Sequence, residues 1–153
     1  MSRRRFLQAA GAVAAGAALP AAAQASRILP VQDIAPLIAR ITGGKPVEKK
    51  GVRVVLPSLA ENGNSVPLGI RVDSPMTASD RVTDLHVFAE RNPRPLVAAY
   101  HFGTAVARAQ VDTRVRLAVE QRVLVIATLS GGRFLSGEAN VVVTSAACID
   151  EGI

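Results

Sequence analysis

The nine residues "SVPLGIRVD" (Ser65–Asp73) alternate between apolar and polar side chains. In an extended chain successive side chains point to opposite faces, so such alternation predicts a strand with one buried and one exposed face. The apolar residues that fall on one face are Val66, Leu68, Ile70 and Val72. We expect these residues to form part of a core between two sheets.

Further strand-like stretches lie before and after this one in the sequence. "QVDTRVRLA" (Gln110–Ala118) alternates in the same way, and five more strand-like runs are "VRVVL" (Val52–Leu56), "DLHVFAE" (Asp84–Glu90), "LVAAYHF" (Leu96–Phe102), "RVLVIATL" (Arg122–Leu129) and "ANVVVT" (Ala139–Thr144). Clusters of Gly, Pro, Asn and Ser separate them. About seven short strands with regular turns predict an all-β, immunoglobulin-like antiparallel sandwich. "RVLVIATL" is apolar on both faces, which favours burial under a second sheet or a partner.

A short helix is predicted before the first strand. Its apolar residues follow helical spacing and are Ile34, Leu37, Ile38 and Ile41. Asp33 is the expected cap, Pro36 falls in the first turn, where proline is tolerated, and Gly43-Gly44 ends the helix.

The amino-terminal segment has the features of an export signal. Arg3, Arg4 and Arg5 precede the apolar run Ala9–Leu19, and Ala23-Gln24-Ala25 is a small-x-small cleavage site. The run is shorter than the roughly 20 residues of a membrane-spanning helix. Adjacent arginines before Phe6-Leu7 match the twin-arginine (Tat) pattern. We therefore expect residues 1–25 to be a Tat signal, residues 26–144 the sandwich domain and residues 145–153 a separate arm.

Charge and composition narrow the function classes. Removal of the signal takes away three arginines and no acid, so the formal net charge falls from +6 to +3. With 3% aromatic residues, no Trp and no basic run after the signal, nucleic-acid binding has little support. No second apolar segment is long enough to span a membrane, so we expect a periplasmic protein without a membrane anchor once the signal is cleaved.

No recognised catalytic motif is present. His86 and His101 lie in predicted strands, and neither belongs to a nucleophile elbow or an H-E-x-x-H zinc pattern. We interpret both as residues of a sheet face or an interface rather than catalytic or ligand residues. Cys148, Asp150 and Glu151 together match no common metal geometry, so no metal or other cofactor is expected.

Cys148 is the only cysteine in the sequence. A single cysteine in an exported protein is usually a free reactive thiol or half of an intermolecular disulfide. The third interpretation, a small buried hydrophobic residue, requires the carboxy-terminal segment to fold back, and only Ile149 and Ile153 could anchor it.

These residues resemble the SoxY family, which carries sulfur in periplasmic thiosulfate oxidation. The resemblance lies in "ENGNSVPLGIRVDSPMTASDRVTDLHVFAERNPRPLVAAYHFGTAVARAQVDTRVRLAVEQRVLVIA" (Glu61–Ala127) and in the arm that bears Cys148. It implies an immunoglobulin-like sandwich paired with a SoxZ-like subunit. It also implies that Cys148 holds sulfur intermediates covalently and presents them to periplasmic sulfur-oxidising enzymes, while this chain is not itself an enzyme.

The arm departs from the usual SoxY pattern, Gly-Gly-Cys-Gly-Gly. Here Cys148 follows Ala146-Ala147 and precedes Ile149-Asp150-Glu151, as in a SoxY-related subgroup with an Ala-Ala-Cys-Ile-acid arm. Alanine lacks the backbone freedom of glycine, so a stiffer arm is expected. The nearby carboxylates disfavour the thiolate and so raise the expected pKa of the thiol.

The sequence leaves two functional hypotheses from different classes. The leading one is a carrier with a covalent sulfur adduct on Cys148. The alternative is a binding or redox module, whose arm docks into a partner or forms a mixed disulfide with it. An enzyme with its own active site ranks third, because nothing near Cys148 in the sequence activates the thiol.

Overall fold

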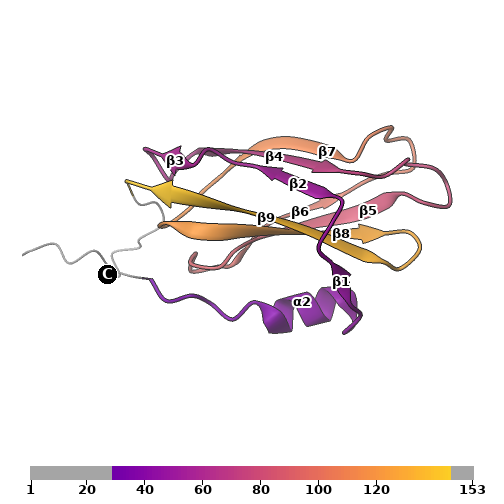
Figure 1. Ribbon diagram of the computed structural model, residues 1–153, viewed down its shortest axis with the longest axis horizontal. Coiled ribbons are helices and arrows are strands. Elements are labelled where there is room, and N and C mark those ends of the chain that lie inside the picture. The colour runs from indigo at the N-terminus through magenta and orange to yellow at the C-terminus, as the bar shows by residue number, and fades with distance from the viewer. Residues whose placement is uncertain (1–28, 146–153) are drawn as a thin grey trace, which may run out of the picture.

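The computed structural model describes residues 29–145, in which two β-sheets face each other (Figure 1). The alternating stretch forms β4 (Val66–Val72), the central strand of the smaller sheet. It pairs antiparallel with β2 (Val52–Val55) on one side and β7 (Gln110–Val115) on the other. Ile70 lies opposite Val54 and Val111, so the apolar residues of all three strands share the inner face.

The larger sheet has the order β1-β9-β8-β5-β6, with β3 also paired to β9. Its strands are β1 (Val47–Glu48), β3 (Leu59–Ala60), β5 (Val82–Ala89), β6 (Leu96–His101), β8 (Gln121–Leu129) and β9 (Phe134–Val143). The long strands pair antiparallel, whereas the two-residue strands β1 and β3 pair parallel to β9. The predicted immunoglobulin-like sandwich with a short amino-terminal helix is confirmed.

The main core lies between the sheets. Leu85 and Val87 of β5 and Val123 and Val125 of β8 have no exposed surface, and they belong to the same apolar cluster as Leu68. Full burial of one such side chain contributes about 1.5–3 kcal/mol. The alternation of apolar and polar residues along the strands therefore determines which faces of the two sheets pack against each other.

Helix α2 (Ala35–Thr42) covers the outer face of the larger sheet (Figure 1). The N-cap residue is Ile34 rather than the predicted Asp33, although Asp33, one residue earlier, accepts a hydrogen bond from the Ala35 N–H at 3.0 Å. Gly43 ends the helix with φ 62°. The predicted apolar positions of the helix pack with Phe88, Ile126 and Phe134 in a second cluster. The inner face of "RVLVIATL" packs against the second sheet, as predicted. Ile126 lies on its outer face, which this chain's own helix covers, and the sequence did not predict that cover. No helix in residues 29–145 has the length and apolar character needed to cross a membrane.

Strand β9 begins at Phe134, earlier than the predicted Ala139. Gly137 lies within it because β2 crosses closely over this point: a Cβ atom on Gly137 would lie 2.1 Å from the Val52 carbonyl oxygen. Glycine in a strand usually weakens it, and here it permits two backbones to approach.

Candidate functional site

The end of β9 is fixed to the sandwich by several hydrogen bonds. The Thr144 N–H donates to the Ala60 carbonyl at 3.0 Å, and the Gly63 N–H donates to the Ser145 carbonyl at 2.8 Å. The Thr144 hydroxyl also donates to the Glu61 carbonyl at 3.2 Å. The chain is thus held up to Ser145, three residues before Cys148 in the sequence.

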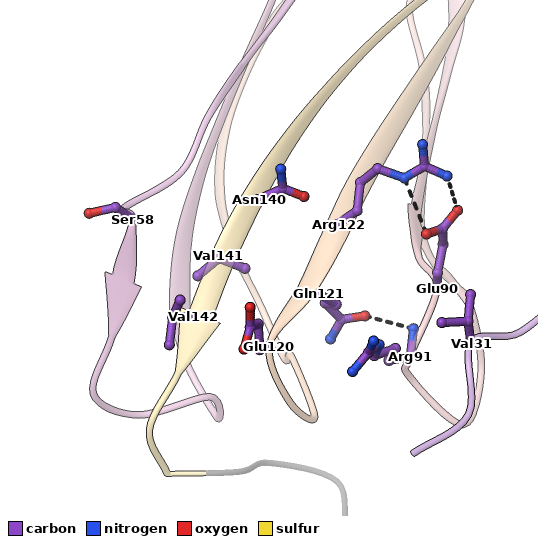
Figure 2. A pocket seen from close by; sticks show the side chains of 10 residues that line it. All are labelled: Val31, Ser58, Glu90, Arg91, Glu120, Gln121, Arg122, Asn140, Val141 and Val142. Atoms are coloured by element: carbon purple, nitrogen blue, oxygen red, sulfur yellow. Dashed lines mark hydrogen bonds and ion pairs between the residues drawn. The ribbon is translucent and has the colours of Figure 1, made fainter. Parts of the chain in front are cut away.

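A pocket of about 440 Å³ lies beside the end of β9 (Figure 2). It is lined by Val31, Ser58, Glu90, Arg91, Glu120, Gln121, Arg122, Asn140, Val141 and Val142. Two acidic and two basic side chains are among them, so their charges largely offset one another. None of the ten is a histidine or a cysteine. The pocket therefore offers polar surface next to the end of β9, and its lining contains no thiol nucleophile or imidazole base.

Two of the four charged side chains of this pocket, Glu90 and Arg122, are paired. The Arg122 guanidinium donates to both carboxylate oxygens of Glu90, as the dashed lines in Figure 2 show, and to Glu138 at 3.0 Å. The Glu90 side chain is only 13% exposed. Glu90 raises the pKa of Arg122 above its ordinary value. Because Arg122 is satisfied by two carboxylates, it is poorly available to a bound anion.

A buried amide, Asn92, joins two loops at the same end of the sandwich. Its Nδ2 donates to the Arg116 carbonyl at 2.8 Å, and its Oδ1 accepts from the Ala118 N–H at 2.9 Å. The same oxygen accepts from Gln121 Nε2 at 2.9 Å. Asn92 is 5% exposed, so these bonds replace the water that its amide loses on burial. The sequence marks Asn92 only as a turn residue, and its role as a clamp was not predicted.

The two histidines lie on a sheet face, as the sequence predicts, and this is the outer face of the larger sheet. His101 is exposed, and its Nδ1 contacts Asp84 Oδ1 on the neighbouring strand. His86 is half-buried, and its Nδ1 has no hydrogen-bond partner among residues 29–145. Burial lowers the pKa of His86. Asp84 partly offsets this lowering, and His101 reinforces it. Within the described part of the chain, no group of three or more His, Cys, Asp or Glu residues could hold a metal ion.

His86 should make stability depend on pH. Its ordinary pKa is 6.5, and the folded state lowers it, so below about pH 6.5 the unfolded chain binds the proton more readily. The contribution of the neutral His86 side chain to the free energy of unfolding is complete above this pH. It is lost as the pH falls through the lowered pKa of the folded state. We expect the urea midpoint of His86→Gln to fall less on acidification than that of the unmodified protein. Equal slopes for His86→Gln and the unmodified protein would contradict the assignment.

The predicted arm residues Ala146, Ala147, Cys148, Ile149, Asp150 and Glu151 lie outside the described residues. The structure therefore places their attachment point, Ser145, and not the residues themselves. The sequence predicts an arm from residue 145, after a last strand that ends at Thr144, and β9 ends at Val143. The pocket and the Asn92 clamp were not predicted, because they depend on contacts between segments distant in sequence.

Comparisons with known proteins agree on the family. Residues 38–148 match the family profile described as "Sulfur oxidation protein SoxY", and residues 1–20 match that of the twin-arginine translocation pathway signal sequence. A comparison with curated proteins found no match.

Solved structures show where the fold recurs. The sulfur carrier protein SoxY from Chlorobium limicola f thiosulfatophilum is 25% identical with a TM-score of 0.59, and the match covers 71% of this chain and 94% of that one. Superoxide reductase (neelaredoxin) from Ignicoccus hospitalis is 13% identical with a TM-score of 0.53, covering 61% and 80%. A putative superoxide reductase from Thermotoga maritima is 17% identical with a TM-score of 0.54, covering 63% and 87%. The two reductases share the fold alone.

Proposed function

The chain belongs to the SoxY family of sulfur oxidation proteins, and we propose that it holds sulfur intermediates covalently on Cys148 and presents them to partner enzymes. It is a sulfur carrier rather than an enzyme, as the family and the related carrier structure indicate. Its Tat signal directs it to export, and it works in the periplasm.

The observation that carries the proposal is that the carboxy-terminal end of the sandwich is anchored shortly before the cysteine. Backbone hydrogen bonds hold the chain up to Ser145, and the only cysteine follows three residues later. Three extended residues span about 10 Å, which is enough to bring a sulfur atom into the cleft of another protein. We propose residues 145–153 as this arm, residues 26–144 as its supporting domain and residues 1–25 as the cleaved signal.

The chemistry requires a partner. When a thiol joins thiosulfate through a new S–S bond, the thiol proton and two electrons leave, and the product is an S-thiosulfonate. An electron acceptor must take up those electrons, and we assign it to the enzyme that loads the arm. The part played by this chain is to supply the thiolate of Cys148 and to hold the product between enzymes.

The acidic residues Asp150 and Glu151 modulate this role. Their carboxylates disfavour the thiolate and any anionic adduct next to them. We propose that a basic entrance on the partner enzyme offsets this repulsion, so that loading is favoured inside the partner and slow in free solution.

Arm length provides a test of presentation. Deletion of Ala146 and Ala147 should leave alkylation of Cys148 by iodoacetamide intact but abolish thiosulfate-dependent oxygen uptake, because the thiol then lies next to the anchored Ser145. Ala146→Gly with Ala147→Gly is the matched control and should retain uptake. Normal uptake by the shortened chain would show that reach from the sandwich is not needed.

We further propose a SoxZ-like subunit as the stable partner, as the family implies. Exposed apolar side chains near the end of β9 support an interface there: Leu59 is 53% exposed, Val142 is 42% exposed, and the two are paired across β3 and β9. Val55 on β2 is also 53% exposed. Co-purification of a second small subunit with the tagged protein from its host checks this pairing, and recovery of a monomer alone would contradict it.

A further inference from the structure

A groove of about 740 Å³ runs between the free edges of the two sheets. Strand β6 is the last strand of the larger sheet and β7 the last of the smaller one, so each has one unpaired edge among the described strands. The groove is lined by Asn92, Pro93, Arg94, Leu96, Val97, Ala98, Tyr100, Arg114, Val115 and Arg116. Its lining thus combines apolar side chains with three arginines and no acid.

The edge of β6 has free backbone groups. The Phe102 N–H donates to the Thr83 carbonyl of the neighbouring segment at 2.8 Å. In an antiparallel ladder the direction of the N–H groups alternates along the strand, so those of Ala99 and His101 point away from β5. Both residues are exposed. An unpaired strand edge of this kind is a template for an added strand.

The three arginines of the groove have no acidic partner within residues 29–145. None of the ion pairs in residues 29–145 involves Arg94, Arg114 or Arg116. Arg114 is oriented by Ser65, to whose hydroxyl and carbonyl it donates at 2.6 and 3.1 Å. The groove therefore presents unneutralised positive charge beside a strand template.

The groove is rigidly connected to the base of the arm. Asn92 clamps the turn that bears Arg94 to the carbonyl of Arg116. The next residue, Leu117, donates its N–H to the Gly63 carbonyl at 2.8 Å, and the Gly63 N–H in turn binds the Ser145 carbonyl. A protein bound in the groove would therefore lie near the point from which the arm extends.

We propose that this groove docks an extended segment of the protein that receives the arm, in which acidic and apolar residues alternate. The segment pairs with the β6 edge as an added strand, its carboxylates face Arg94, Arg114 and Arg116, and its apolar side chains contact Leu96, Val97 and Tyr100. The existence of the docking site rests on the groove alone, whereas the identity of its occupant as a receiving protein rests on the proposed carrier role.

The test is a titration of the exported form of the protein, labelled with nitrogen-15, with a capped octapeptide that alternates Glu and Val. We expect saturable shifts of the Ala99 and His101 amide signals. A peptide N-methylated at alternate residues, which cannot complete the ladder, should bind about tenfold more weakly, and a Lys-Val peptide should not bind. Arg94→Gln with Arg116→Gln should weaken binding about tenfold, since exposed ion pairs contribute up to roughly fivefold each.

Control variants separate docking from general charge and from the carrier role. Arg53→Gln with Arg108→Gln removes the same charge outside the groove and should leave binding unchanged. Cys148→Ser should also bind normally, so a failure of the carrier hypothesis does not affect this measurement. Equal affinity for the N-methylated peptide, equal losses in both arginine pairs, or no binding of the Glu-Val peptide would each overturn the proposal.

Discussion

Cys148→Ser is expected to abolish thiosulfate-dependent oxygen uptake in the host, while folding, export and partner binding stay intact. Serine is close to cysteine in size, and its hydroxyl cannot form a sulfur–sulfur bond. The sandwich is held by its own core and by hydrogen bonds that end at Ser145, so it does not depend on this side chain. Oxygen uptake by cells that carry the variant, with the export level checked by immunoblot of the periplasm, measures the effect.

A relocated thiol provides the control. Ser145→Cys combined with Cys148→Ser restores one thiol at the residue whose carbonyl is bound by Gly63. We expect this protein to be alkylated and yet inactive, because the thiol is too close to the sandwich to enter another protein. Full activity of Cys148→Ser would instead favour a docking module whose arm needs no sulfur.

Gly137→Ala is expected to lower the free energy of unfolding by about 3 kcal/mol or more, at the upper end of the cost of overpacking. The added Cβ would lie 2.1 Å from the Val52 carbonyl oxygen and 2.8 Å from its carbon, and backbone atoms of a paired strand cannot move aside cheaply. Urea denaturation followed by circular dichroism measures the loss.

Gly131→Ala is the matched control for this substitution. A Cβ at Gly131 would have no atom within 4 Å, so the change in unfolding free energy should stay within about 0.5 kcal/mol. Equal midpoints for Gly137→Ala and the unmodified protein would contradict the close crossing of β2 over β9.

Twofold periodicity was sufficient to predict the sandwich, because burial of alternate residues is a local property of the sequence. It was insufficient for the part of β9 before Ala139. There Ser136 and Gly137 interrupt the apolar pattern, and the backbone of β2, which is distant in sequence, passes close to Gly137. It also could not identify what covers Ile126, since the packing of α2 on β8 joins segments far apart in the chain.

The features of the candidate site also fall into two groups, those that the sequence indicates and those that only the structure reveals. Cys148 was singled out from the sequence because a single thiol on a short segment is unusual, and its role stays a prediction. The Asn92 clamp and the arginine-lined groove were not singled out, because they assemble from turns separated by more than twenty residues. In each case the informative contact is a hydrogen bond between loops, which leaves no periodic pattern.

The most direct test of the carrier hypothesis is the mass of the protein taken from its host during thiosulfate oxidation. The protein should be purified without reductant, measured intact and then digested to locate any adduct. We expect added sulfur, or sulfur with oxygen, on the peptide that contains Cys148, with its loss after reduction. A free thiol throughout turnover, or only a mixed disulfide with another protein, would contradict the claim that this chain carries sulfur on Cys148.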